Sequence, residues 1–263
     1  MTGRQLARVN TVKYGETLWS ELYPGNQHTV NCLQPAVTAT ESSLELAQAQ
    51  RQRTVWRFDG GAGSDEQFQW LFNRGYHVVG KGLSNFRACA LAQQVRRWDS
   101  YADCQLGEVT PPIDYGRPVR VFVKRRLKKD KWRHSYYVTS LQFPSKGLFM
   151  TAYNQRGGAE VEQFRQDKQG LALAARRKAS LNGQKACVLL TDLAHNLLTH
   201  FSRHALAESR FRAFGLKRIV RDLLHIPGAL HFEGVRVKKV ELLTLNQNSR
   251  DLIICLEKYI SGG

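Results

Sequence analysis

Short apolar runs and amphipathic stretches alternate in the first half of the chain. Residues 54–58 combine β-branched and aromatic side chains and run into a glycine-rich turn, which is typical of a short strand. Ser64 then fits a helix N-cap, with Gln67 three residues later completing a capping-box pattern, and Gly75 fits the helix end. Apolar residues resume directly afterwards. The stretch 54–80 therefore predicts strand, helix and strand with tight connections, a parallel βαβ unit.

The flanking segments predict further strands and a helix. Residues 5–12 have the pattern of a short strand, and residues 33–53 have the composition of a helix. Residues 119–123 and 136–140 are strand-like and are joined through a strongly basic stretch. These last two runs predict an antiparallel β segment in the middle of the chain.

Apolar positions in the second half repeat with helical spacing. One helix is predicted to begin near Gly158, and another covers residues 184–205. The apolar stripe of the second helix consists of Val188, Leu189, Leu193, Leu197 and Phe201. Residues 211–225 predict a further amphipathic helix, and residues 230–245 predict a hairpin that turns at Glu233-Gly234.

The charge of the chain indicates a polyanionic partner. Its 39 Lys and Arg against 22 Asp and Glu give a formal net charge of +17 over 263 residues. Neutralising phosphates releases condensed counterions and drives association, so nucleic acid is the first candidate partner. An acidic membrane surface is the second, but no segment approaches the roughly 20 apolar residues of a spanning helix.

The five cysteines are scattered and form no CxxC pair, which supports neither a zinc ribbon nor a disulfide framework. The first ten residues lack the apolar centre of a signal peptide. We therefore expect a reduced, cytoplasmic protein.

Asp59 is the first candidate for chemistry. It falls at the carboxyl end of the strand predicted at 54–58, where ligands gather in open α/β sheets. The glycines that follow allow another backbone to approach closely, which suits a metal or phosphate site. The alternative is that Asp59 only caps an Asp-Gly turn.

The second candidate region is the stretch 153–171. Tyr153, Arg156 and Glu160 have the spacing Tyr-x2-Arg-x3-Glu, and Lys168 follows after seven residues. Together with residues 57–82, this stretch resembles the DDE transposases of bacterial insertion sequences, in the cut-and-paste group with a β-rich insertion. In that group the signature ends in Lys after six residues, so Lys168 comes one residue late.

The resemblance implies an α/β, RNase-H-like core that is truncated at its N-terminus. It places the first part of the core at 1–82 and a β-rich antiparallel insertion at 83–147. A helical second part of the core, carrying the Glu, would occupy 148–225. Residues 226–263 would form a C-terminal hairpin and strand extension.

The resemblance also implies the site residues. Asp59 and Glu160 would be catalytic and bind metal, while Tyr153, Arg156 and Lys168 would position phosphates of the transposon end. Glu162 is the alternative acid, but on a helix it lies about 200° around from Glu160, whereas Arg156 lies one turn from Glu160. Three acids would hold two Mg²⁺ (or Mn²⁺) ions about 3.5–4 Å apart.

The first aspartate of the family has no counterpart here. No acidic residue precedes Glu16, and no Asp precedes Asp59. We therefore expect a truncated or frameshifted copy, a C-terminal fragment that lacks the first Asp and is inactive alone.

A basic run supplies the second group of candidate DNA contacts. Its members are Lys124, Arg125, Arg126, Lys128, Lys129, Lys131, Trp132 and Arg133. Trp132 could stack on an unpaired base, or it could simply pack on the sheet.

The expected partners are double-stranded DNA, as transposon ends and target, and a second copy of the chain in a homodimer on DNA. Two other functions remain open. One is a non-catalytic DNA-binding or interaction protein derived from a transposase, and the other is an RNase-H-like nuclease.

Overall fold

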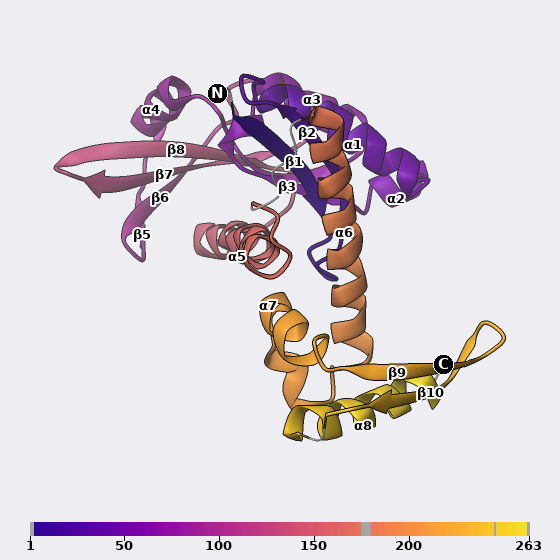
Figure 1. Cartoon of the computed structure of the whole chain (residues 1–263). Coiled ribbons are helices and arrows are strands. Elements are labelled where there is room, and N and C mark those ends of the chain that lie inside the picture. The colour runs from indigo at the N-terminus through magenta and orange to yellow at the C-terminus, as the bar shows by residue number, and fades with distance from the viewer. Residues whose placement is uncertain (1–2, 175–179, 245, 262–263) are drawn as a thin grey trace. The chain divides into compact units, whose positions relative to one another are not determined.

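The chain divides into two compact units, which are described separately (Figure 1). The computed structural model describes residues 3–174, 180–244 and 246–261, without the side chains of 156–161. The first unit comprises Met1–Val9 and Tyr23–Gly158, and the second comprises Asn10–Leu22 and Ala159–Gly263. Near the N-terminus, β1 (Arg4–Asn10) and β2 (Thr17–Pro24) form a two-stranded sheet, which agrees with the strand predicted at 5–12.

The first unit is built on a mixed six-stranded sheet of order β3-β4-β8-β7-β6-β5. The parallel pair is β3 (Val55–Phe58) and β4 (His77–Lys81), joined by α3 (Asp65–Asn73), so the predicted βαβ unit is confirmed. The other neighbouring strands are antiparallel. They are β5 (Asp99–Tyr101), β6 (Cys104–Val109), β7 (Arg120–Lys128) and β8 (Lys131–Thr139).

The middle segment extends the sheet of the βαβ unit. β8 pairs with β4, placing Thr139 opposite Val79, and the predicted antiparallel pair is the β7–β8 hairpin. Its tight turn is Lys129-Asp130, and both residues have positive φ (49° and 57°). A type I′ turn requires positive φ at both of its central residues, and its twist matches that of the flanking strands.

Two hydrophobic clusters cover opposite faces of this sheet. On one face, Val121, Val123, Tyr136 and Val138 pack with buried residues of α1 (Val30–Ser43), α3 and α4 (Asn85–Gln94). On the other, Phe122 and Tyr137 pack against Phe149, Met150 and Tyr153 of α5 (Lys146–Gly170). In Figure 1, α4 and α5 accordingly lie on opposite sides of the β7–β8 hairpin. Alternation along a strand sends successive side chains to opposite faces.

Two helix predictions need correction in their bounds, and one predicted capping box is only half formed. The stretch 33–53 is interrupted after α1, where Glu45 has a φ of +49°, and α2 covers only Gln48–Arg51. The helix expected near Gly158 begins at Lys146, because Ser145 Oγ accepts the Leu148 N–H (3.1 Å) and Phe149 is drawn into the core. The N-cap at Ser64 is confirmed, but the Gln67 side chain donates to the Val30 carbonyl (3.2 Å) instead of closing a capping box.

The second unit is mainly helical. Its elements are the second half of α5, α6 (Leu181–His204), a 3-10 helix η2 (Arg210–Ala213), α7 (Leu216–Arg218), a π-helix η3 (Ile219–Leu223), β9 (Gly228–Glu233), β10 (Arg236–Leu242) and α8 (Gln247–Ser261). The predicted hairpin is confirmed as β9–β10. The single helix expected over 211–225 is broken, since the chain is extended at Phe214 and Gly215. The expected C-terminal strand extension is the helix α8.

The apolar stripe predicted on α6 is mostly not the buried face. Leu189, Leu193 and Leu197 are each more than half exposed. The residues buried instead are Val188, Thr191, Asp192, His195 and Leu198. This set keeps the helical spacing of three and four residues, but it includes an acid and a histidine.

Glu41 lies at the centre of a buried polar cluster in the first unit, and its contacts predict how the stability of the fold depends on pH. Burial would raise the pKa of Glu41, but hydrogen bonds from Arg74 and from Tyr76 Oη (2.7 Å) outweigh burial and lower it. A lowered folded-state pKa stabilises the fold above the unfolded value of about 4.3, and this stability is lost as the pH falls through the folded-state pKa.

We expect Glu41→Gln to reduce the free energy of unfolding at pH 7 by about 3 kcal/mol, because Arg74 loses its buried partner. The difference from wild type should shrink as the pH falls below about 4. Urea unfolding of both proteins at pH 7, 5 and 3.5 measures this. A constant difference across that range would contradict the assignment.

Candidate functional site

Asp59 lies at the carboxyl end of β3, as predicted, and its side chain is exposed. Its Oδ1 accepts the backbone N–H of Gly61 (3.0 Å), so the turn-capping bond is made. A carboxylate accepts several bonds, and this one leaves further capacity for a ligand. Gly63 faces the Lys81 carbonyl so closely that a Cβ would overlap it, which explains a glycine at this position. The loop after Asp59 is thereby held against the end of β4.

Arg57 connects this strand end to the helix that carries the Tyr-x2-Arg-x3-Glu signature. Its Nη1 donates to the carbonyl of Ala152 on α5 (3.1 Å), one residue before Tyr153. The two sequence regions singled out for chemistry therefore meet within the first unit. The contact involves the backbone of α5, so neither its donor nor its acceptor could be foreseen from the signature.

Tyr153 itself is only 6% exposed, and its ring packs edge-on against Tyr137, with 4.7 Å between ring centroids. Arg156 and Glu160 follow on the same helix, and their side chains lie outside the described residues. Glu160 also belongs to the second unit, whereas Asp59 belongs to the first. The structure therefore brings the strand of Asp59 to the start of the signature helix, and the relation of the two acids stays a prediction.

The alternative acid, Glu162, is engaged with its own helix. Its Oε1 accepts from Arg165 Nη2 (2.7 Å) and Gln166 Nε2 (3.2 Å), and these hydrogen bonds lower the pKa of Glu162. Such a carboxylate is already matched by a neighbouring cation.

The late position of Lys168 has a structural counterpart that sequence reasoning missed. The residue at the expected Lys position is Asp167, which is fully buried, while Lys168 is exposed. Successive helix residues differ by about 100° in direction, so only one of the two can face the interior. Asp167 Oδ1 lies 2.7 Å from His195 Nδ1, and His195 Nε2 lies 2.8 Å from the Gly15 carbonyl. His195, only 2% exposed, is therefore a hydrogen-bonded core residue.

The described side chains do not by themselves make a site for Mg²⁺ or Mn²⁺. Among them, no group of three His, Cys, Asp or Glu residues is placed to hold a metal ion. Asp59 is the carboxylate at the strand end, and hard cations of this kind require several oxygen ligands. A metal ion at Asp59 would therefore need oxygen ligands beyond those that the described side chains supply there.

The β7–β8 hairpin separates its charges by face. The register pairs Lys124 with Ser135, Arg126 with Arg133 and Lys128 with Lys131. Directly opposite residues share a face of the hairpin, so these five cations lie on the same face as Phe122 and Tyr137, which pack against α5. We call this set, Lys124, Arg126, Lys128, Lys131 and Arg133, the basic face. A shallow hollow of about 710 Å³ at the hairpin end is lined by Lys128, Lys129, Lys131 and Arg133.

Arg125 and Trp132 lie on the opposite face. The Arg125 guanidinium lies between two indoles, 4.1 Å from the Trp98 centroid and 4.6 Å from that of Trp132. Its Nε also donates to Gln105 Oε1 (2.6 Å). Trp132 is 45% exposed and packs on the sheet through Arg125, which matches the structural alternative for this residue.

The sequence was compared with models of known protein families. The sequence model of the family described as "Transposase DDE domain group 1" matches residues 13–246. No curated protein matches the chain. None of the helices in the described parts of the chain has the length and apolar character needed to cross a bilayer. The matched region spans the Asp59 strand end, the basic hairpin and the signature helix, and the chain belongs to the DDE transposase family.

Proposed function

We propose that this chain carries the catalytic core of an insertion-sequence transposase, and that it binds DNA but does not complete strand cleavage alone. The ancestral reaction is Mg²⁺- or Mn²⁺-dependent cleavage and transfer of DNA strands. The supporting observation is the Arg57–Ala152 hydrogen bond, which joins the strand end bearing Asp59 to the helix bearing Tyr153, Arg156 and Glu160. Metal ions held by three carboxylates would activate the attacking oxygen and stabilise the leaving one. Asp59 and Glu160 would be two of those three ligands.

Of the four acidic residues before Asp59, three are already paired, and the fourth, Glu45, is exposed just after α1 and has a positive φ. Glu16 pairs with Arg203 (3.0 Å), Glu21 pairs with Lys185 (2.5 Å), and Glu41 is buried with Arg74. In addition, β3 is an edge strand of the described sheet, so Asp59 has a strand neighbour on one side only. This supports the proposal that cleavage is incomplete in the 263-residue chain.

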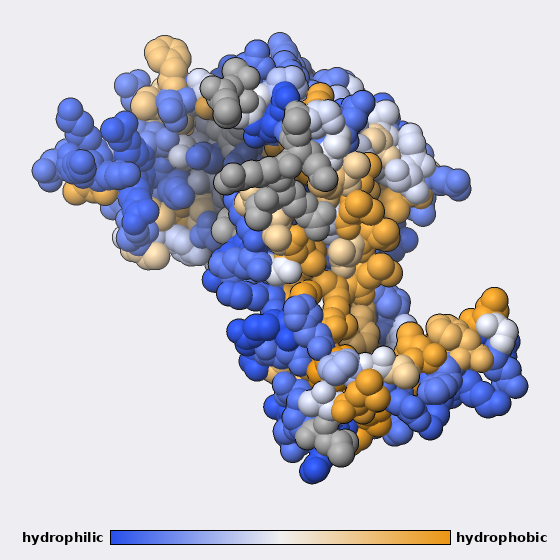
Figure 2. All heavy atoms as spheres, viewed as in Figure 1, coloured by the Kyte–Doolittle hydropathy of each residue, from blue (hydrophilic) through white to orange (hydrophobic). Residues whose placement is uncertain are grey.

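Double-stranded DNA, as transposon ends and target, is the proposed partner. The basic face gathers five cations on one side of the hairpin, and the net charge of +17 favours a polyanion. In Figure 2 the free end of the β7–β8 hairpin, at the left, is covered mainly by hydrophilic residues. We further propose that the chain acts as a homodimer on DNA, in keeping with its family.

The cleavage half of the proposal is tested with duplexes from the flanks of the encoding locus, in Mg²⁺ and in Mn²⁺. We expect the chain to bind these duplexes without nicking them. Asp59→Asn should leave duplex affinity within about two-fold, since one exposed carboxylate that is not part of the basic face changes the charge little. Nicking by the wild type that Asp59→Asn abolishes would overturn the proposal of an inactive core and favour an active transposase or an RNase-H-like nuclease.

The basic face also supports a second candidate, a non-catalytic DNA-binding or interaction protein derived from a transposase. The two candidates differ in what an intact relative would do in its presence. Competition for the transposon ends, measured as reduced cleavage by an active relative when this chain is added, would favour the non-catalytic role.

A further inference from the structure

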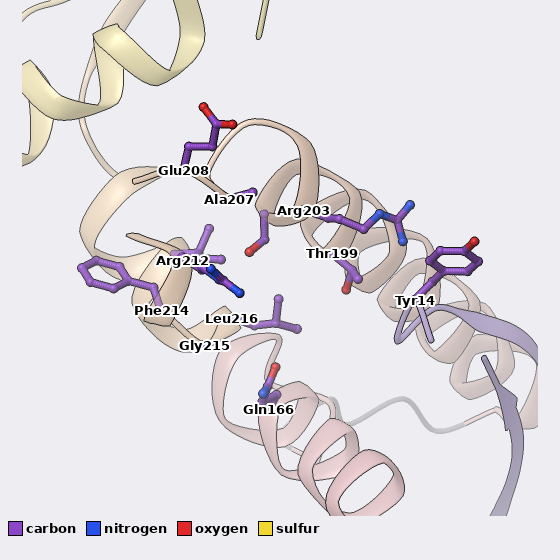
Figure 3. A pocket seen from close by; sticks show the side chains of 12 residues that line it. Tyr14, Gln166, Thr199, Arg203, Ala207, Glu208, Arg212, Phe214, Gly215 and Leu216 are labelled. Carbon is purple, nitrogen blue, oxygen red and sulfur yellow. The ribbon is translucent and has the colours of Figure 1, made fainter. Parts of the chain in front are cut away.

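The second unit contains a hollow of about 660 Å³ whose lining includes neither Asp59 nor a member of the basic face (Figure 3). Its walls come from the C-terminal part of α6, the end of η2, the start of α7, Gln166 of α5 and Tyr14. Every one of these segments belongs to the second unit. Its volume is in the range of small-molecule sites.

Arg203 is fixed in the wall of this hollow with an unused donor. Its Nη2 donates to Glu16 Oε1 (3.0 Å), and its guanidinium carbon lies 4.7 Å from the Tyr14 ring centroid. Its Nη1 is buried and has no hydrogen-bond partner within the described parts of the chain. A buried donor without an acceptor is costly, and an acceptor supplied by a ligand would remove that cost.

Arg212 supplies the net charge of the hollow. In Figure 3 its side chain points into the hollow, whereas Glu208 points away from it. Glu208 is 88% exposed and lies 4.0 Å from Lys258. The charge of Arg203 is matched by Glu16, so Arg212 leaves the hollow with about one positive charge. The C-terminal end of α6 opposes this with about half a negative charge, so the balance stays positive.

The remaining lining combines hydroxyl groups with an apolar wall. Ser202 and Thr199 contribute hydroxyls from α6, and Phe214, Leu216 and Ile219 contribute apolar surface. Guanidinium groups bind phosphate oxygens with charge-assisted hydrogen bonds, and hydroxyls add donors. The apolar wall would contact the sugar or base attached to such a phosphate.

We propose that this hollow binds a phosphate group of a nucleic acid or nucleotide, with Arg203 Nη1 and Arg212 as its main donors. For the DNA-borne phosphate, the inference rests on the proposed function and adds a second contact region to the basic face. The same chemistry also fits the phosphate of a free nucleotide.

The test compares Arg212→Gln with Lys217→Gln in the full chain. Both residues are exposed, both changes remove one positive charge, and Lys217 is adjacent to the hollow without lining it. Binding of a 20-base-pair duplex and of the dinucleotide pTpT is measured for each, with thermal unfolding as a check of the fold. We expect Arg212→Gln to lose about ten-fold in affinity, as for one charge-assisted contact, and Lys217→Gln to lose less than two-fold.

The two probes separate the sources of the phosphate. Loss with the duplex supports a DNA contact, and loss confined to pTpT supports a nucleotide site. Equal losses in both variants, or no loss in either, would overturn the proposal. If the wild type binds no duplex at all, the proposed function fails, and the pTpT measurement still decides whether the hollow binds phosphate.

Discussion

Replacing Lys124, Arg126 and Lys128 together with glutamine should weaken duplex binding by on the order of 100-fold near 0.1 M salt. The three residues alternate along β7 and lie on the basic face. Each phosphate contact that is lost removes roughly 0.9 from the slope of log affinity against log salt concentration. We therefore expect both a lower affinity and a shallower salt dependence, measured by fluorescence anisotropy from 50 to 300 mM salt.

Arg125→Gln provides the matched control. It removes the same charge from the same strand, but the Arg125 guanidinium lies between Trp98 and Trp132 on the opposite face. Its effect on duplex affinity should be less than about three-fold, whereas Arg133→Gln on the basic face should cost about ten-fold. If Arg125→Gln weakened binding as much as Arg133→Gln, the two faces of the hairpin would not differ in DNA contact. The one-sided assignment would then be wrong.

Asp167→Ala should reduce the free energy of unfolding by about 3–5 kcal/mol, the largest stability effect expected of any single change here. Asp167 is fully buried and His195 is 2% exposed. Both ring nitrogens of His195 face acceptors, the Asp167 carboxylate and the Gly15 carbonyl. Removing the carboxylate leaves that ring buried without its charge partner.

Urea denaturation of the full chain measures this effect, with Lys168→Ala as the control. Lys168 is the next residue on α5 and is exposed, so its removal should change stability by less than about 0.5 kcal/mol. The double change Asp167→Leu with His195→Leu should recover part of the loss, because replacing both members of a buried pair avoids an orphaned charge. A loss below about 1 kcal/mol for Asp167→Ala would show that the pair is not desolvated as the structure indicates.

The residues proposed for cleavage, by contrast, are only partly brought together by the fold. The Arg57 contact with Ala152 joins β3 to α5, and Tyr153 is buried in the core, where it packs against Tyr137. Phosphate positioning by Tyr153 therefore stays a prediction, as do the roles of Arg156, Glu160 and Lys168. The DNA contacts proposed for the basic hairpin and for the hollow around Arg203 would not require a complete set of acids.

Sequence by itself determined the elements whose signals are local. The β3–α3–β4 unit follows from apolar runs of strand length, a Ser64 N-cap and a Gly75 stop, all within 54–80. The β9–β10 hairpin follows from a strand-like stretch with a turn at Glu233-Gly234. For β7–β8 the sequence indicated the antiparallel pair, whereas the structure extends both strands through the basic stretch to the Lys129-Asp130 turn. The position of Asp59 at a strand end was fixed by the same short-range pattern. In each case, the interacting residues are near neighbours in the chain, so spacing alone sets the geometry.

Only the tertiary structure decided which face of an element is buried and what meets it. Leucine spacing on α6 predicted an apolar buried stripe. Instead His195 is buried, because it forms hydrogen bonds with Asp167 and Gly15, and the leucines at 189, 193 and 197 are exposed. Arg125 and Arg126 are equivalent in sequence, yet strand alternation and Trp98 place them on opposite faces. The early start of α5 depends on packing of Phe149 against Phe122, with 4.4 Å between ring centroids. These outcomes depend on partners distant in the chain, and hydrophobic pattern carries no information about which distant partner a face will meet.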